Sequence, residues 1–90
     1  MNQKEKDIIL NHISDFARER CFHFAIMSKH SEAGNVAMAK VAYHIYCKYK
    51  NMTNSLIIVA RELGLHSESD GVYAQSFKEG KERAEMEWKK

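Results

Sequence analysis

The chain has 90 residues, a net charge of +2 and a hydrophobic fraction of 44%. This size fits a single domain, and the small net charge gives no reason by itself to expect a nucleic-acid partner. With no proline and only four glycines, the composition argues against an all-β or loop-rich protein, because turns usually need both residues.

The polar first residues have no apolar segment behind them, so the sequence predicts no signal peptide. The longest aliphatic run, Leu56–Ala60, is far too short to span a bilayer. We therefore expect a cytoplasmic protein without membrane contact, in which Cys21 and Cys47 are reduced thiols.

The first predicted helix covers about residues 4–31. One broad apolar face repeats at helical spacing and comprises Ile9, Leu10, Ile13, Phe16, Ala17, Cys21, Phe24 and Met27. Gly34 then predicts a left-handed residue that ends the helix, and Asn35 predicts the cap of the next one. A connection this short predicts an antiparallel hairpin.

The second predicted helix covers about residues 35–63. Its apolar stripe repeats in steps of four and three: Met38, Ala42, Ile45, Tyr49, Met52, Leu56, Val59 and Leu63. The polar stretch at residues 51–55 has poor helix propensity, so the helix either continues through it or breaks there. The stripe stays in phase across the stretch, which favours continuity. Gly64 followed by Leu65 predicts a Schellman end.

The third predicted helix covers about residues 72–88, after a polar linker at residues 66–71. Ser67 and Asp70 in the linker have the spacing of a capping box. One side of the helix carries Tyr73, Phe77, Ala84 and Trp88. Gly80 on the same side either weakens the helix or lets another backbone come close. The predicted fold is all-α, a single domain over residues 1–90 with a long antiparallel hairpin and a third amphipathic helix.

A second apolar line on the first helix predicts self-association. Ile8, Phe22 and Ile26 lie roughly opposite its main apolar face, and a helix that is apolar on two sides is usually buried on two sides. Tyr43 and Tyr46 add side chains of the kind enriched at protein interfaces. We expect these five residues to form an interface in a homodimer or higher oligomer. The alternative is a monomer whose third helix covers the extra apolar line.

A set of basic residues supports a second hypothesis about function. Arg20 falls within the apolar face of the first helix, where it either pairs with an acid or binds an anion in a cleft between helices. Lys40, His44, Lys48 and Lys50 flank the stripe of the second helix, and cations beside tyrosines can bind nucleic acid or a small phosphorylated, nucleotide-like ligand.

The five histidines raise the question of a metal site. His12, Glu19, His23 and His30 share one line of the first helix, and His44 with Cys47 lies on the second. The chain lacks both the Cys-x-x-Cys and the Glu-x-x-His motif, so we predict neither a metal nor another cofactor. It also lacks a phosphate-binding loop and any recognisable nucleophile motif, so we predict no enzyme.

Ile58–Leu65 resembles the first helix and turn of a helix-turn-helix DNA-binding motif, with the small residue Ala60 four positions before Gly64. The resemblance implies a recognition helix from Ser67 that contains Glu68 and Asp70, whose carboxylates oppose phosphate binding.

The leading prediction is therefore a small non-enzymatic interaction protein that binds or inhibits another macromolecule, in the manner of an accessory or phage-type regulator. Its expected partners are a second copy of the chain and an unidentified protein. The alternative is an oligomeric binder of nucleic acid or a nucleotide.

Overall fold

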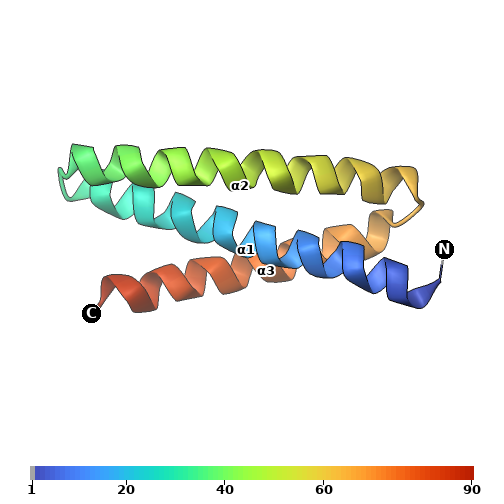
Figure 1. Cartoon of the computed structure of the whole chain (residues 1–90). Helices are drawn as coiled ribbons and strands as arrows, with labels where there is room; N and C mark the ends of the chain where they lie inside the picture. The colour runs from blue at the N-terminus through green and yellow to red at the C-terminus, as the bar shows by residue number, and fades with distance from the viewer. Residues whose placement is uncertain (1) are drawn as a thin grey trace.

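The computed structural model describes residues 2–90 and contains three helices, α1 (Gln3–Glu32), α2 (Val36–Glu62) and α3 (His66–Trp88). No strand occurs in this range, so the all-α prediction is confirmed. Figure 1 shows α1 and α2 as an antiparallel hairpin and α3 running back in the direction of α1. Both α2 and α3 pack along α1, whereas they hardly contact one another. The central helix is therefore α1.

Both predicted turns are confirmed. Gly34 has a φ of +79°, and the Asn35 side chain accepts a hydrogen bond from the Met38 amide at 3.2 Å. Gly64 also has a φ of +79°, a conformation that glycine adopts without steric cost. The Leu65 amide then donates to the Ala60 carbonyl at 2.8 Å, as in a Schellman motif.

The α2 helix is continuous through its polar stretch, which confirms the favoured alternative. The Thr53 hydroxyl donates to the Tyr49 carbonyl at 2.6 Å, and the Ser55 hydroxyl donates to the Asn51 carbonyl at 3.0 Å. These bonds satisfy the hydroxyls within the helix. Thr53 can therefore be fully buried without an unpaired polar group.

The start of α3 differs from the prediction. The helix begins at His66 rather than near Val72, so the expected linker is helical. Leu65 is the N-cap residue and makes no side-chain cap bond, so the expected capping box does not form. The segment looks like a linker in sequence because most of its residues face solvent. Its one buried residue is Ser69, whose hydroxyl donates to the His66 carbonyl at 3.0 Å.

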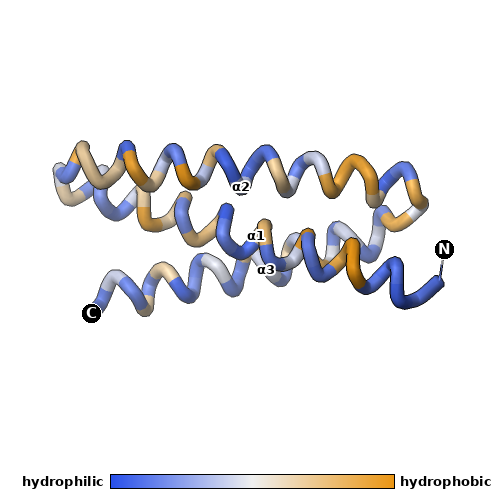
Figure 2. The backbone as a smooth tube through the Cα atoms, viewed as in Figure 1, coloured by the Kyte–Doolittle hydropathy of each residue, from blue (hydrophilic) through white to orange (hydrophobic). Residues whose placement is uncertain are grey.

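The core is small and lies where all three helices meet. Ile13, Ala60 and Leu65 form its buried centre, and the partly buried side chains around them are Ile9, Leu56, Ile57 and Val72. Elsewhere the buried positions hold small residues: Ala17, Cys21, Ala42, Thr53, Ser69, Ser76 and Ala84. In Figure 2 the apolar colour concentrates on α1 and α2, while α3 is mostly hydrophilic.

Close approach, rather than large apolar side chains, attaches α3 to α1. A Cβ atom at Gly80 would lie 2.6 Å from the Arg18 carbonyl oxygen and 3.0 Å from Cys21 Cβ. Nearby, the Ser76 hydroxyl donates to the Ser14 hydroxyl at 3.1 Å. Of the two roles considered for Gly80, the structure confirms that it lets another backbone come close.

The apolar stripe of α2 is buried only in part. Ala42 is buried, but Met38, Val59 and Leu63 are 45%, 43% and 47% exposed. Two causes combine: α1 covers only one flank of the stripe, and a strict 3.5-residue repeat drifts about 20° per heptad around a straight helix. Ile57, which lies off the stripe, packs against the core instead.

None of the helices within residues 2–90 is both long enough and apolar enough to cross a membrane.

Candidate interaction surfaces

Residues from all three helices line a cleft over the middle of α1. Figure 1 shows α3 separating from α2 beyond their shared turn, and the cleft lies where the two have parted. Its volume is about 150 Å³. We call it the aromatic cleft, and its lining residues are Arg20, Cys21, Phe24, Tyr46, Tyr73 and Phe77. It continues into a groove of about 390 Å³ between α1 and α3 that shares Cys21, Phe24 and Phe77.

Two phenylalanines of the aromatic cleft are open to solvent. Phe24 is 47% exposed and Phe77 is 49% exposed. The Phe24 ring centroid lies 5.3 Å from that of Tyr46, so α1 and α2 together present an aromatic surface. Exposed rings gathered in a concave site are typical of binding surfaces rather than of a closed monomer core.

Arg20 sits in this cleft with a neutral partner. Its Nη1 donates to Asn54 Oδ1 at 3.1 Å, and its guanidinium lies 5.4 Å from the Tyr73 ring centroid. The other arginines of residues 2–90 each lie within 4.0 Å of a carboxylate, whereas Arg20 does not. The acid partner considered in the sequence analysis is thus replaced by an amide, and the charge of Arg20 is not neutralised.

Burial alters the chemistry of two cleft residues. It raises the pKa of the Tyr73 hydroxyl, although Arg20 acts in the opposite direction. It also raises the pKa of the Cys21 thiol, again against the effect of Arg20. Both groups are therefore protonated at neutral pH, and Tyr73 can donate a hydrogen bond to a ligand.

A second surface lies on the hairpin on the side away from α3. Ser14 bonds to α3, and Phe16, two positions later, points about 200° away around the helix. Two shallow pockets on this side are lined by residues of α1, of α2 and of its C-cap Leu63, with none from α3. We call this surface the hairpin face, and the apolar residues of its pockets are Ile8, Ile9, Phe16, Met52, Leu56 and Leu63. Val59 is assigned to the same face because it is exposed and lies on the α2 stripe, seven residues after Met52 and four before Leu63.

The residues predicted to form one interface are placed apart. Phe22 is half-buried beneath α3, with the Arg83 guanidinium 4.0 Å from its ring centroid, and Ile26 is half-buried as well. Ile8 is 49% exposed and belongs to the hairpin face. Tyr43 is 50% exposed, and its ring lies 6.2 Å from that of Tyr46 on the side of the aromatic cleft. Part of the second apolar line is thus covered by α3, as in the monomer alternative.

The predicted basic residues do not converge on one site either. Lys40, His44 and Lys48 are exposed and follow each other at intervals of four, so they form a row along α2, and Lys40 also lines a pocket between α1 and α2 beside Tyr43. Lys50 is two positions beyond Lys48 and points about 200° away from it. Arg20 lies in the aromatic cleft.

The line of histidines contains one side-chain pair with a structural role. His23 Nε2 lies 3.3 Å from Glu19 Oε2, and the His23 ring stacks on Tyr49 with centroids 5.9 Å apart. Burial lowers the pKa of His23, although Glu19 raises it. Glu19 also accepts a hydrogen bond from Arg83 at 2.8 Å. In the part of the chain that the structure describes, no three potential metal ligands come together.

The arrangement around Gly64 differs from a helix-turn-helix. In that motif two helices meet at about 90–120°, whereas Figure 1 shows α3 folding back antiparallel to α2. Asp70 is exposed and lies 3.9 Å from Arg61. Comparisons with protein-family models, curated proteins and solved structures find no match to this chain.

Sequence reasoning did not assign Phe24, Tyr73 and Phe77 to a site. Their helical spacing placed Phe24 on the core face of α1 and the other two on the apolar side of α3. Only the separation of α3 from α2 leaves them at an open cleft. The one usable signal was Arg20, since a cation within an apolar face requires a partner.

Proposed function

We propose that this chain is a non-enzymatic interaction protein that associates with a second copy of itself and binds another protein. The observation that carries the proposal is the hairpin face, an apolar surface that the chain's own third helix leaves uncovered. Its exposed members include Ile8, Val59 and Leu63, each more than 40% exposed. Contiguous apolar patches of this kind are typical of protein–protein contacts.

The spacing of the α2 stripe favours a second copy as the cover. A sustained 3.5-residue repeat is the pattern of a helix that packs between neighbours, and α1 supplies only one neighbour. The hairpin face extends along α2 from Met52 to Leu63, about 17 Å, and two helices side by side are about 20 Å wide. This gives about 330 Å² per copy, the size of an apolar patch that marks a contact site, so an interface of roughly 800 Å² per partner would extend beyond this patch.

The hairpin face is also poor in charge. Of the residues that line its two pockets, the only charged one is Glu5. Depletion of charged residues is characteristic of the centre of an interface, because each buried charge must be desolvated.

Light scattering behind size exclusion tests this proposal with two neighbouring substitutions. Val59→Glu places a charge on the hairpin face, whereas Ile58→Glu places it on the outer side of α2. The two side chains are 43% and 57% exposed, so neither substitution disturbs a core. We expect an oligomeric wild type, a monomeric V59E variant and an oligomeric I58E variant. A monomeric wild type, or the same mass for V59E, would contradict the assigned surface.

One observation favours the alternative function. The α2 helix has four Lys or Arg residues and one acidic residue. Lys40 and Lys48 form a row with His44, which lies between them. Such a row can contact phosphates of nucleic acid or of a nucleotide. An oligonucleotide is therefore included as a probe in the binding experiment described below.

A further inference from the structure

We infer that the aromatic cleft holds an acidic, apolar helical segment of the partner protein, with Arg20 paired to one of its carboxylates. This inference rests on the proposed function, because it names the chemistry of the second protein. It concerns a different surface from the hairpin face, so the two can fail separately.

The shape of the site suits a helix laid along α1. The aromatic cleft and its adjoining groove form one concave path, with Tyr46 of α2 on one wall and Phe77 of α3 on the other. Amphipathic helices bind such grooves through apolar side chains spaced three and four residues apart. Phe24 and Phe77, each about half exposed, supply the apolar contacts.

The charge of the site favours an acidic occupant. The cleft and groove are lined by three basic residues, Arg20, Lys29 and Lys81, and two acidic ones, Glu32 and Glu85. Lys29 and Glu85 pair with each other at 2.9 Å. Within residues 2–90, Arg20 and Lys81 have no carboxylate within 4.0 Å, and Glu32 has no cation within that distance, so two unpaired cations and one unpaired carboxylate leave the site with one net positive charge.

Arg20 is the specific recognition group. Its bond to Asn54 uses Nη1, which leaves other guanidinium donors free. It is half-buried beside the Tyr73 ring, where a carboxylate bond is stronger than at a fully solvated site. The protonated Tyr73 hydroxyl is a second potential donor nearby.

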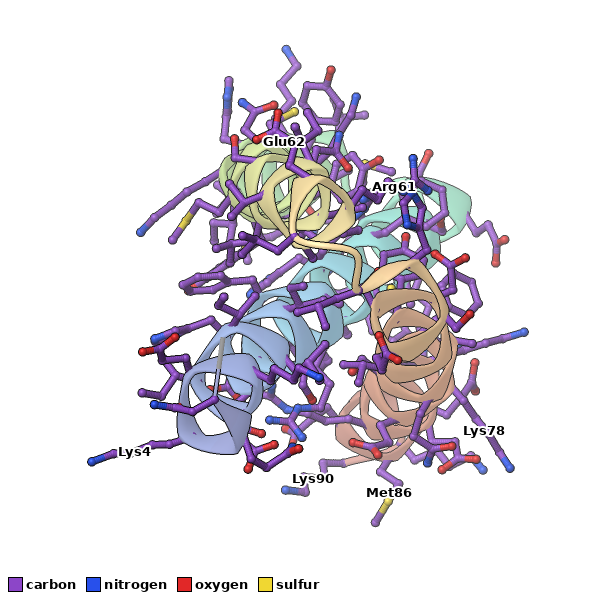
Figure 3. All side chains as sticks on the ribbon, turned by 90° about the vertical axis from the view of Figure 1, so that its right-hand side faces the viewer. Lys4, Arg61, Glu62, Lys78, Met86 and Lys90 are labelled. Carbon is purple, nitrogen blue, oxygen red and sulfur yellow. The ribbon has the colours of Figure 1, made fainter. Side chains whose placement is uncertain are left out.

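Nucleic acid fits the cleft less well than an acidic helix. None of the row residues Lys40, His44 and Lys48 lines the aromatic cleft or its groove, and Lys40 lines a separate pocket of α1 and α2 beside Tyr43. In Figure 3 the labelled Lys78 and Lys90 also point outward into solvent. The row therefore supplies no phosphate contact within the cleft and groove, where the unpaired cations are Arg20 and Lys81.

Fluorescence anisotropy with a labelled peptide tests the inference. The probe is a helical peptide of about 16 residues, with leucines along one face and glutamates beside them. Its controls are the same peptide with glutamine for every glutamate and a labelled single-stranded oligonucleotide. We expect the acidic peptide to bind best, with Phe77→Ser weakening binding about tenfold and Arg20→Gln about fivefold.

Arg61→Gln is the matched control, because Arg61 already lies near a carboxylate of its own chain, Asp70 at 3.9 Å. It should leave peptide affinity unchanged. Monomeric V59E should bind the peptide as wild type does, which separates this site from self-association. Absence of peptide binding, equal binding of the glutamine peptide, or preferential binding of the oligonucleotide would each overturn the inference. So would a change of mass in F77S, because it would place a second copy in the cleft.

Discussion

Gly80 decides how closely α3 approaches α1, because its missing side chain leaves room for the α1 backbone. An added Cβ atom would lie 2.6 Å from the Arg18 carbonyl oxygen and 3.0 Å from the Phe22 amide nitrogen. Real Cβ atoms do not reach 2.6 Å from a backbone atom, so a larger residue must push the helices apart. Helix propensity at position 80 therefore favours a residue other than glycine, whereas the contact with α1 requires glycine.

We predict that Gly80→Ala lowers the free energy of unfolding by about 1–3 kcal/mol, because overpacking exceeds the gain in helix propensity. Gly71→Ala in the same helix is the matched control, since nothing lies within 4 Å of its added Cβ. It should raise the free energy of unfolding by about 0.5–1 kcal/mol. Urea denaturation followed by circular dichroism measures both. Equal effects of the two substitutions would show that the close approach does not matter.

At the scale of elements, α3 is attached to α1 by small residues and a set of exposed ion pairs. Arg18 lies 3.2 Å from Glu79, and Lys29 lies 2.9 Å from Glu85. Hydrogen bonds from Gln75 and Arg18 lower the pKa of Glu79 below its ordinary value of 4.5, and a hydrogen bond from Lys29 lowers that of Glu85. The Glu79 and Glu85 side chains are 39% and 49% exposed, so each pair contributes little by itself and is screened by salt.

The lowered pKa values of Glu79 and Glu85 determine in which direction the stability of the fold changes with pH. A carboxyl group whose pKa is lower in the folded state stabilises that state above the unfolded pKa, and this contribution is lost as the pH falls through the folded value. We therefore predict that acidification below 4.5 reduces the melting temperature, and that the double variant Glu79→Gln, Glu85→Gln shows a smaller reduction. Calorimetry between about pH 6 and pH 3 measures this. If the melting temperature of the double variant fell as steeply with pH as that of the wild type, the assignment of this pH dependence to Glu79 and Glu85 would be wrong.

The molecule as a whole exposes more surface than its mass requires. Its radius of gyration is 14.4 Å, against about 12 Å for a compact domain of this length. Its accessible surface is 5880 Å², against about 5,400 Å² for a typical monomer of its mass. Ile13 is the only large apolar residue among the fully buried side chains of residues 2–90. A monomer built in this way has little apolar burial to offset its conformational entropy.

Self-association should therefore stabilise the fold. Because a partner that binds only the folded state raises apparent stability by mass action, we predict that the melting temperature of the wild type rises with protein concentration. The V59E variant should melt at a lower temperature that does not depend on concentration, whereas I58E should follow the wild type. Scanning calorimetry over a hundredfold concentration range measures this. A wild type without concentration dependence would argue against a functional oligomer.

Local features of the sequence were sufficient to predict three helices and both turns. Gly34 and Gly64 adopt the left-handed conformation, Asn35 caps α2, and the in-phase stripe carries α2 through Thr53. These properties depend on residues within one or two turns of each other. The start of α3 was missed for the same reason, since its first turn is polar in sequence and its helical state depends on Leu65 being buried against the other helices.

The sequence by itself therefore determined the three helices, their order along the chain and the two glycine turns between them. Only the tertiary structure decided which apolar line of α1 is covered, why Phe24 and Phe77 remain open, and that Arg20 meets Asn54 rather than an acid. These outcomes depend on the path of α3 across α1, which Gly80 sets by close approach. Packing between helices is a contact between distant residues, and helical spacing records which faces are apolar but not which partner covers them.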